Sequence, residues 1–386
     1  MAEQHEKALV PQIRFTGFTD PWEQRELVDI AEIVGGGTPD TNNSNYWDGD
    51  IDWYAPAELG NNIYAESSTR KITQAGFDSC STKMLPADKT ILFTSRAGIG
   101  NTAILRHSAC TNQGFQSLVI GDADVYFVYS MSERIKKWAE EKASGSTFLE
   151  ISGRQLETMP VNLPSLVEQQ AIGSFFSHLD DLITLHQRKY DKLVILKKSM
   201  LEKMFPKDGE SVPEIRFAGF TDPWEQRKFS EIVDVCSGRD YKHLDEGPIP
   251  VYGTGGYMTS VSEALSHNRD AIGIGRKGTI DKPYLLKAPF WTVDTLFYAI
   301  PKSDINLEFA LCSFLNVDWK SKDESTGLPS LSKESINETV LSVPNVVEQN
   351  HLGNFFADLD RLITLHQRKL ELLQNIKKSL LDKMFV

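Results

Sequence analysis

The sequence predicts two mixed α/β (α+β) domains, joined by two long antiparallel coiled-coil helices in a pseudo-twofold arrangement. Length is the first observation: the chain has 386 residues, more than one hydrophobic core usually supports, so two or three domains are expected. The second observation is an internal repeat, and the third is an apolar spacing of alternately three and four residues, which is typical of a coiled-coil seam. We expect a first domain over residues 1–160, a first long helix over 161–205, a second domain over 206–340 and a second long helix over 341–386.

The repeat consists of two nearly fixed elements. Residues 13–25 recur as residues 215–227 with one substitution, at an offset of 202, whereas residues 167–205 recur in large part as 347–385, at an offset of 180. The first copy therefore carries 22 extra residues, which a weaker match between the segments around Arg96 and Arg276 places before about Ile91. Two fixed elements alternate with two variable segments that differ in sequence and length.

The variable segments, roughly 26–160 and 228–340, contain short β-rich runs separated by turn residues. Examples of such runs are residues 51–54, 91–93, 118–120, 271–274 and 296–300. Each segment then contains a predicted helix, Ser132 to Lys142 in the first and about Asn306 to Trp319 in the second. Each variable segment is thus predicted to fold as a compact α/β or α+β domain.

Each long helix begins with a predicted capping box, Ser165 with Glu168 in the first copy and Asn345 with Glu348 in the second. Apolar residues then repeat with an average spacing of 3.5 residues, which predicts that the two helices pair with each other. At 1.5 Å per residue, a helix of about 37 residues would be a rod of roughly 55 Å that spaces the two domains.

Histidine and lysine interrupt the apolar seam of both helices. We interpret His186 and His366 as residues that hydrogen-bond across the helix pair and fix its register, in preference to metal ligands. A second row of apolar residues gives the helices more apolar surface than a two-stranded seam can bury, so a partner helix or the variable domains must cover it.

Candidate contact residues lie in polar and glycine-rich loops of the variable segments. Gly273–Gly278 matches GxGxxG, but Thr279, Asp281 and Pro283 follow, so the loop does not open a helix as a nucleotide-binding turn does. Two roles fit this loop: its cations contact a phosphate or a base edge, or the loop is a purely structural turn. The proposed nucleic-acid contacts are Asn42, Asn43, Tyr46, Arg96, Asn101, Arg239, Tyr241, Lys242, Thr254, Tyr257, Arg276 and Lys277, with Asn45 and Trp47 as further candidates and ordinary loop roles as the alternative.

Composition limits the other classes of function. The net charge of −12 and pI of about 5.2 argue, taken alone, against a nucleic-acid partner. The charge is concentrated in the variable segments, with −7 over 26–160 and −4 over 228–340, so it does not exclude DNA binding by selected loops. No apolar run approaches the roughly 18 residues of a membrane span and the N-terminus resembles no signal peptide, which predicts a cytoplasmic protein. The four cysteines contain no CxxC pair, so neither a metal site nor a disulfide framework is expected.

The chain resembles the specificity (S) subunit of type I DNA restriction-modification enzymes along essentially its whole length. The resemblance rests on Pro164–Lys189 and its repeat Pro344–Lys369, on the segments around Trp22 and Trp224, and on the glycine-rich loops of Arg96 and Arg276.

This resemblance implies two target recognition domains, each reading half of a split DNA site, with the helices as a ruler between them. It implies modification (methyltransferase) subunits, two per chain, docked on the long helices, and restriction (translocase/endonuclease) subunits joining them. The chain itself would be non-catalytic and hold no cofactor, since S-adenosylmethionine, ATP and Mg belong to those partners. The predicted subunit interface consists of Phe175, Phe176, Leu182, Leu185, Phe355, Phe356, Leu362 and Leu365.

Because the variable segments differ, we expect an asymmetric bipartite DNA target. The alternative is a non-catalytic coiled-coil scaffold whose two end domains bind proteins, which the acidic charge favours. An enzyme acting alone ranks third, because the sequence has no methyltransferase NPPY or DPPY motif, no Walker A loop and no nucleophile or carboxylate cluster repeated at equivalent places.

Overall fold

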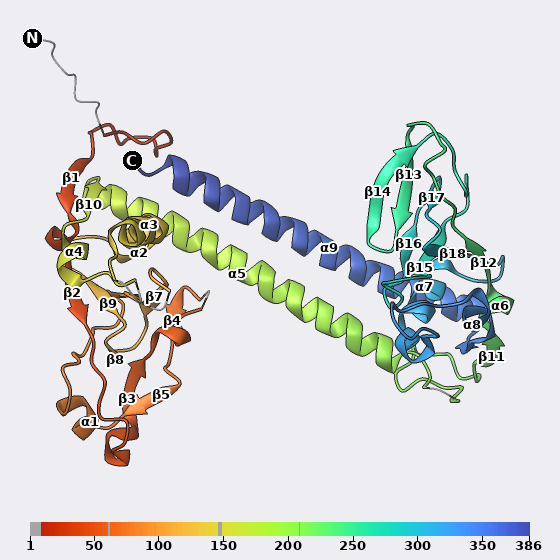
Figure 1. Ribbon diagram of the computed structural model, residues 1–386, viewed down its shortest axis with the longest axis horizontal. Coiled ribbons are helices and arrows are strands. Elements are labelled where there is room, and N and C mark those ends of the chain that lie inside the picture. The colour runs from red at the N-terminus through yellow and green to blue at the C-terminus, as the bar shows by residue number, and fades with distance from the viewer. Residues whose placement is uncertain (1–8, 61, 97, 146–148, 208) are drawn as a thin grey trace, which may run out of the picture. The chain divides into compact units, whose positions relative to one another are not determined.

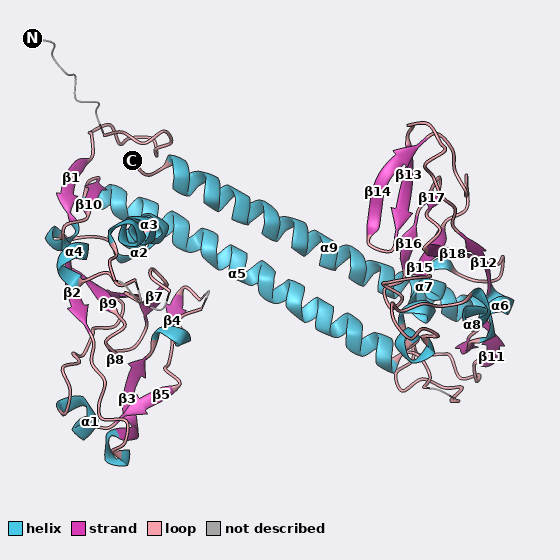
Figure 2. Cartoon of the chain, viewed as in Figure 1, coloured by secondary structure: helices cyan, strands magenta, loops and turns pink. Residues whose placement is uncertain are grey.

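The computed structural model describes residues 9–60, 62–96, 98–145, 149–207 and 209–386. These residues form two compact units: unit 1 contains the described residues up to Leu185 together with Leu370–Val386, and unit 2 contains His186–Lys369. Each unit combines one variable domain with part of each long helix. Both are mixed α/β (Figures 1 and 2), which confirms the predicted fold class.

Unit 1 contains three sheets. The largest has the strand order β2-β9-β6-β7-β4, a smaller sheet has the order β5-β3-β8, and β1 pairs antiparallel with β10. The strands are β1 (Glu23–Glu26), β2 (Ala31–Gly35), β3 (Trp47–Tyr54), β4 (Tyr64–Ala65), β5 (Arg70–Ile72), β6 (Thr90–Phe93), β7 (Thr102–Leu105), β8 (Cys110–Thr111), β9 (Gln116–Ile120) and β10 (Pro160–Leu163). The shorter helices are α1 (Gln74–Asp78), α2 (Val125–Ser130), α3 (Ser132–Lys142) and α4 (Gly153–Glu157), with 3-10 turns η1 (Leu27–Asp29), η2 (Ser44–Tyr46) and η3 (Pro56–Glu58). The helix predicted over Ser132–Lys142 is confirmed as α3.

Unit 2 repeats this plan with different details. Its sheets have the orders β12-β18-β15-β16, β14-β13-β17 and β11-β19. The strands are β11 (Glu225–Lys228), β12 (Val233–Ser237), β13 (Ile249–Gly253), β14 (Gly256–Val261), β15 (Ala271–Gly275), β16 (Tyr284–Leu286), β17 (Trp291–Thr292), β18 (Leu296–Pro301) and β19 (Val340–Val343); the shorter helices are α6 (Phe229–Ile232), α7 (Leu307–Leu315) and α8 (Lys333–Glu338), with the 3-10 turn η4 (Trp319–Lys322). The helix predicted to reach Trp319 ends earlier, at Leu315, and a separate 3-10 turn follows. The glycine loop of Gly273–Gly278 joins strand β15 to a turn and opens no helix, as predicted.

The long helices are α5 (Leu166–Lys203) and α9 (Val346–Lys383), both within the predicted helical segments. In unit 2, His186 Nδ1 lies 2.8 Å from His366 Nδ1, and Lys197 Nζ lies 2.6 Å from an oxygen of Asp360. The residue number rises along one helix as it falls along the other, so the helices are antiparallel in this unit. The predicted hydrogen bond between the two histidines is confirmed.

A buried ion pair fixes the start of each long helix. Glu168 N bonds Ser165 Oγ at 3.4 Å, as a capping box requires, but the Glu168 carboxylate does not reach back to Ser165. It instead accepts from Arg14 Nε and Nη2, each at 2.7 Å, and Arg216 binds Glu348 in the same way in unit 2. The predicted bond from the glutamate N–H to the capping side chain therefore forms in both helices, whereas the glutamate side chain binds a distant arginine in place of the main chain.

Each core is completed by the end of a long helix. In unit 1 Trp22 packs edge-on against Phe385, which follows α9, with ring centroids 6.1 Å apart. In unit 2 Trp224 packs against Phe205, which follows α5, at 5.8 Å. In the described part of the chain, no helix is apolar over a stretch long enough to cross a membrane.

Candidate functional site

Most of the predicted contact residues lie around the small three-stranded sheets, β5-β3-β8 in unit 1 and β14-β13-β17 in unit 2, and the others lie on turns that follow β6 and β15 of the larger sheets. The two sheets are equivalent: β3 runs parallel to β8 as β13 runs parallel to β17. The same main-chain bond anchors the incoming loop, from Gly37 N to Thr111 O at 2.9 Å and from Arg239 N to Thr292 O at 2.8 Å. The frame of the site is therefore shared, although the exposed residues differ.

In unit 2, three of the predicted contacts line one open hollow of about 490 Å³. Tyr241, Lys242 and Thr254 lie on its wall together with Asp294 and Thr295. Arg239 precedes this group and is exposed, and Tyr257 projects from edge strand β14 with 64% of its surface exposed. The structure thus brings these five predicted residues to one sheet.

The cationic turn after β15 adjoins the same hollow. Arg276 N donates to Thr295 O at 2.8 Å, and Arg276 Nη1 donates to Asp294 O at 3.4 Å. The side chains of Arg276 and Lys277 are exposed. Arg276 and Lys277 line a hollow of their own, and the main-chain bond to Thr295 connects it to the hollow lined by Tyr241, Lys242 and Thr254.

In unit 1 the predicted contact residues lie in two places, on the turn between β6 and β7 and on the asparagine-rich loop before β3. Arg96 and Asn101 lie on the turn between β6 and β7, in which Ala97 lies outside the described residues. Ser95 N donates to Gly114 O at 2.8 Å, which ties this turn to the segment after β8 just as the Arg276 turn is tied to the segment after β17. The equivalence that the sequence suggested for these turns is confirmed in their main-chain contacts.

The asparagine-rich loop of unit 1 leads into β3. Asn42 and Asn45 are exposed, whereas the side chain of Asn43 accepts from Asn45 N at 3.1 Å and so caps η2. Tyr46 is half-buried, and its main-chain carbonyl accepts from Thr73 N. Trp47, a further candidate, is only 7% exposed and belongs to the core, so its prediction as a contact residue is wrong.

Sequence reasoning missed Arg70, which covers this tryptophan. The Arg70 guanidinium carbon lies 3.6 Å from the centroid of the Trp47 ring and 5.9 Å from that of Trp53. The two tryptophans pack edge-to-face with centroids 5.1 Å apart. A linear pattern does not reveal this cluster, because Trp47 and Arg70 are 23 residues apart and meet through the pairing of β3 with β5.

Hydrogen bonds hold one carboxylate of this sheet in its charged form. Burial would raise the pKa of Asp52, but bonds from the main chain and side chain of Ser68 and the ion pair with Lys71 outweigh it and lower the pKa below its ordinary value. In unit 2, the Tyr284 hydroxyl donates to Gly253 O at 2.6 Å and fixes the end of β13, and burial raises the pKa of Tyr284. Both groups order the small sheets and do not titrate near neutral pH.

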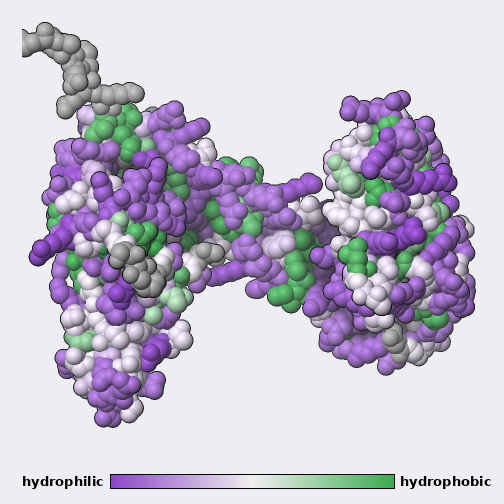
Figure 3. All heavy atoms as spheres, in the orientation of Figure 1, coloured by the Kyte–Doolittle hydropathy of each residue, from purple (hydrophilic) through white to green (hydrophobic). Residues whose placement is uncertain are grey.

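The predicted subunit interface divides into exposed and buried residues. Phe176 and Phe356 are 0% and 1% exposed in their own cores, so their assignment to the interface is wrong: a side chain buried within its own unit has no surface left for a partner. Phe175 and Phe355 are half-buried against Phe15 and Phe217. Leu182, Leu185, Leu362 and Leu365 are 43–46% exposed. Hydrophobic surface along the long helices is visible in Figure 3.

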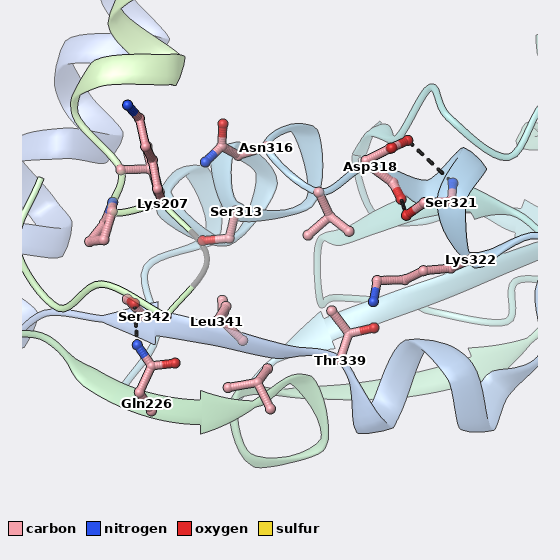
Figure 4. Close-up of a pocket in the computed structure, with 15 residues that line it drawn as sticks. Lys207, Gln226, Ser313, Asn316, Asp318, Ser321, Lys322, Thr339, Leu341 and Ser342 are labelled. Atoms are coloured by element: carbon pink, nitrogen blue, oxygen red, sulfur yellow. Dashed lines mark hydrogen bonds between the residues drawn. The ribbon is translucent and has the colours of Figure 1, made fainter.

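A second polar hollow, of about 240 Å³, lies in unit 2 beside β11 and β19. It is shown in Figure 4, where Gln226 Nε2 donates to Ser342 Oγ at 2.7 Å and Ser321 Oγ donates to Asp318 O at 2.7 Å. None of the predicted contact residues lines it. Among the described residues, no group of three or more His, Cys, Asp or Glu side chains is arranged to hold a metal ion.

Fold and surfaces together define a class of protein: a modular chain in which a repeated frame carries two different recognition surfaces. The chain belongs to the family of type I restriction modification DNA specificity domains, which it matches over residues 19–194 and 221–375. Two stretches match, and each corresponds to one copy of the duplication.

Individual relatives agree with the family. The chain is 34% identical over 233 residues to the type I restriction enzyme MjaIX specificity subunit of Methanocaldococcus jannaschii, an alignment that covers 56% of this chain and 52% of the relative. It is 27% identical over 188 residues to the EcoR124I/EcoR124II specificity subunit of Escherichia coli, covering 44% and 46% of the two chains. These alignments span about half the length of those relatives.

The fold has a solved counterpart. The crystal structure of a type I restriction-modification system S subunit from M. genitalium matches with a TM-score of 0.69 and 19% identity, covering 98% of this chain and 99% of that one. At this identity the likeness concerns the fold alone.

Proposed function

We propose that this chain is the DNA-reading specificity subunit of a type I restriction-modification complex, and that it recognises an asymmetric bipartite target. The observation that carries the proposal is the pairing of one frame with two dissimilar surfaces. Arg14–Glu168 and Arg216–Glu348 repeat within 0.1 Å, at 2.7–2.8 Å. The small sheets above these frames present different residues, so the two half-sites should differ.

Family membership and the named relatives support the DNA partner and a non-catalytic role. Methyl transfer with S-adenosylmethionine, and translocation and cleavage with ATP and Mg, would belong to modification and restriction subunits. Two modification subunits per chain, one for each copy of the frame, are the stoichiometry that we propose. The site of action would be the cytoplasm, where the DNA is.

The exposed leucines support docking of the partner subunits on the long helices. A half-exposed leucine leaves apolar surface in water, and Leu182, Leu185, Leu362 and Leu365 occur at equivalent positions of the two copies. A repeated apolar face suits two copies of one partner.

Methylation sequencing tests this function. The chain is expressed with the modification subunit of its own host in cells that lack other adenine and cytosine methylation. A bipartite motif with two different half-sites and an unspecific gap is expected, and a continuous or palindromic motif would refute the asymmetric reading.

One observation favours a second function, a coiled-coil scaffold that binds proteins. The net charge of −12 leaves few cations for phosphate contacts, which normally supply much of the affinity for DNA. Absence of any sequence-specific shift by the chain together with its modification partner would favour the scaffold over the DNA reader.

A further inference from the structure

A pre-oriented arginine stands on the edge of the small sheet of unit 1. Arg70 begins β5, the edge strand of β5-β3-β8, where it pairs in register with Trp53. Its side chain is exposed, and stacking on a tryptophan ring favours one orientation of the guanidinium. It lies over Trp47, which is 7% exposed and is braced edge-to-face by the buried Trp53.

The geometry of the stack leaves the hydrogen-bonding edge of the guanidinium open. A carbon-to-centroid distance of 3.6 Å is van der Waals contact, which a planar guanidinium reaches only face-on. Face-on stacking uses the π face and directs the N–H donors sideways, in the plane of the group. Within the described parts of the chain, the Arg70 side chain has no hydrogen bond or ion pair, although β3 beside it carries three aspartates, Asp48, Asp50 and Asp52.

A second arginine of unit 1 shows what a purely structural stack looks like. The Arg106 guanidinium lies 3.7 Å from the centroid of the Tyr64 ring, so its stacking matches that of Arg70. Arg106 Nη1, however, also donates to Asp88 Oδ1 at 3.1 Å. The two arginines differ in whether the donors are used: Arg106 donates to Asp88, whereas Arg70 is stacked with its donors unused at the surface.

We propose that Arg70 reads a guanine in the half-site recognised by unit 1, by donating two hydrogen bonds to O6 and N7 in the major groove. This inference rests on the proposed function. Proteins that read DNA with a β-sheet place strands in a groove, and β5 forms the edge of the three-stranded sheet β5-β3-β8 with β3 beside it. A bidentate arginine is the commonest contact specific for guanine, and a fork held in one plane loses little freedom when it binds.

The neighbouring residues fit a base-reading edge. The asparagine-rich loop with the exposed Asn42 and Asn45 leads directly into β3, and Lys71 beside Arg70 is held in an ion pair with Asp52. Arg70 is thus the unpaired cation of its strand. In unit 2 the equivalent edge strand, β14, exposes Tyr257 and Met258 at 64% and 53%, so the same place there reads with different chemistry.

The test compares methylation motifs of the assembled complex. Chains with Arg70→Ala, Arg70→Lys and the control Arg106→Ala are each expressed with the host modification subunit, and methylated sites are sequenced. Arg70→Ala and Arg70→Lys should relax one guanine of one half-site, lowering discrimination at that position by about 5- to 150-fold while the other half-site is unchanged. Arg106→Ala should leave the motif as it is.

Three results would overturn the inference. One is an unchanged motif in both Arg70 variants. Another is an equal loss of DNA affinity at all sites, with the dependence of affinity on salt concentration reduced by about one phosphate contact, which would mean that Arg70 contacts the DNA backbone. The third is relaxation at a base other than guanine.

Two further controls separate folding and function from readout. If circular dichroism shows that Arg70→Ala is unfolded, Arg70→Lys decides, because its aliphatic stem still covers Trp47. A wild-type complex that yields no bipartite motif would refute the proposed function itself, and a wild-type motif that survives both Arg70 variants would refute only the role of Arg70.

Discussion

Replacing Glu168 by Gln should loosen unit 1 and leave unit 2 unaffected. The Glu168 side chain is 1% exposed and Arg14 is 11% exposed, so the pair is shielded from water. Both carboxylate oxygens accept from Arg14, and Arg14 Nη2 also donates to Asp20 O at 2.6 Å. The bond from Arg14 to Glu168, opposed by burial and helped by the charge of Glu168, raises the pKa of Arg14, which stays protonated in the variant.

The expected cost follows from what the glutamine leaves behind. Removing one partner of a buried pair costs about 3–5 kcal/mol, because a charge remains without compensation. Glutamine keeps one acceptor for Arg14 and Asp20 O is retained, so we expect the lower end, about 3 kcal/mol. That is about a 150-fold increase in the population of the opened unit.

Hydrogen exchange read by mass spectrometry measures this separately for each unit. In Glu168→Gln, amides of β1 and β10 should exchange about 150-fold faster, with β11 and β19 unchanged. Glu348→Gln should give the mirror result, because Arg216 binds it with bond lengths within 0.1 Å of those in unit 1 and with the same side-chain exposure. Arg25→Ala, which breaks a pair whose side chains are 50% and 72% exposed, should change exchange by less than about fivefold. An acceleration below tenfold, or one spread equally over both units, would refute this reasoning.

Three other predictions concern pH, assembly and affinity. Burial, followed by the charges of His366, Lys369 and Lys189, lowers the pKa of His186, so unit 2 should lose stability as the pH falls below about 6.5, the pKa of the unfolded state. In the double variant His186→Gln/His366→Gln, the urea midpoint should therefore change less between pH 7.5 and 5.5 than it does in the wild type. An equal fall of the midpoint in both proteins would contradict this prediction. Leu182→Glu/Leu362→Glu should abolish co-purification with the modification subunit without changing the circular dichroism spectrum. The control Leu328→Glu, at a residue 65% exposed in the variable domain, should leave co-purification intact. If the double variant still co-purifies, the docking surface lies elsewhere. The isolated chain should bind its target at least about tenfold more weakly than the complex at physiological salt, as measured by fluorescence anisotropy, because its net charge of −12 opposes contact with phosphates. Tight specific binding by the chain alone would refute this prediction.

Repeats and periodicity predicted the elements that depend on local sequence. Both long helices follow from their capping residues and the spacing of apolar residues, and the histidine bond follows from two equivalent seam positions. Periodicity shows which residues are apolar on a helix but not which apolar row faces the core, so Phe176 and Phe356 were assigned to a surface that they do not reach.

Long-range partners were beyond prediction for a different reason. Glu168 has the position of a capping residue, yet an arginine 154 residues away offers a bidentate charged bond, which outcompetes a single bond to the main chain. Lys197 and Lys377 interrupt the apolar seam, and each forms an ion pair with an aspartate of the other helix, Asp360 and Asp180 respectively. The Arg70 site depends likewise on how β3 and β5 pair, which residue types alone do not specify.

The two repeat offsets have one structural explanation. In unit 2, Ile215 N donates to Lys203 O and Trp224 N donates to Ser211 O, across a continuous stretch of chain. In unit 1 the same bonds run from Ile13 N to Lys383 O and from Trp22 N to Leu9 O, so the end of α9 takes the place that the end of α5 has in unit 2.

Each unit is therefore built from its own tryptophan segment, its own variable domain, the start of one long helix and the end of the other. The tryptophan segments are offset by 202 and the helices by 180 because the 22 extra residues lie between them, in the variable segment of unit 1. The frame contacts stay the same whether the chain is continuous or not, and whichever variable domain they carry. A frame that is insensitive to its insert is what allows two unlike surfaces to be displayed on one chain, and it leaves the choice of bases to residues such as Arg70 that touch nothing in the frame.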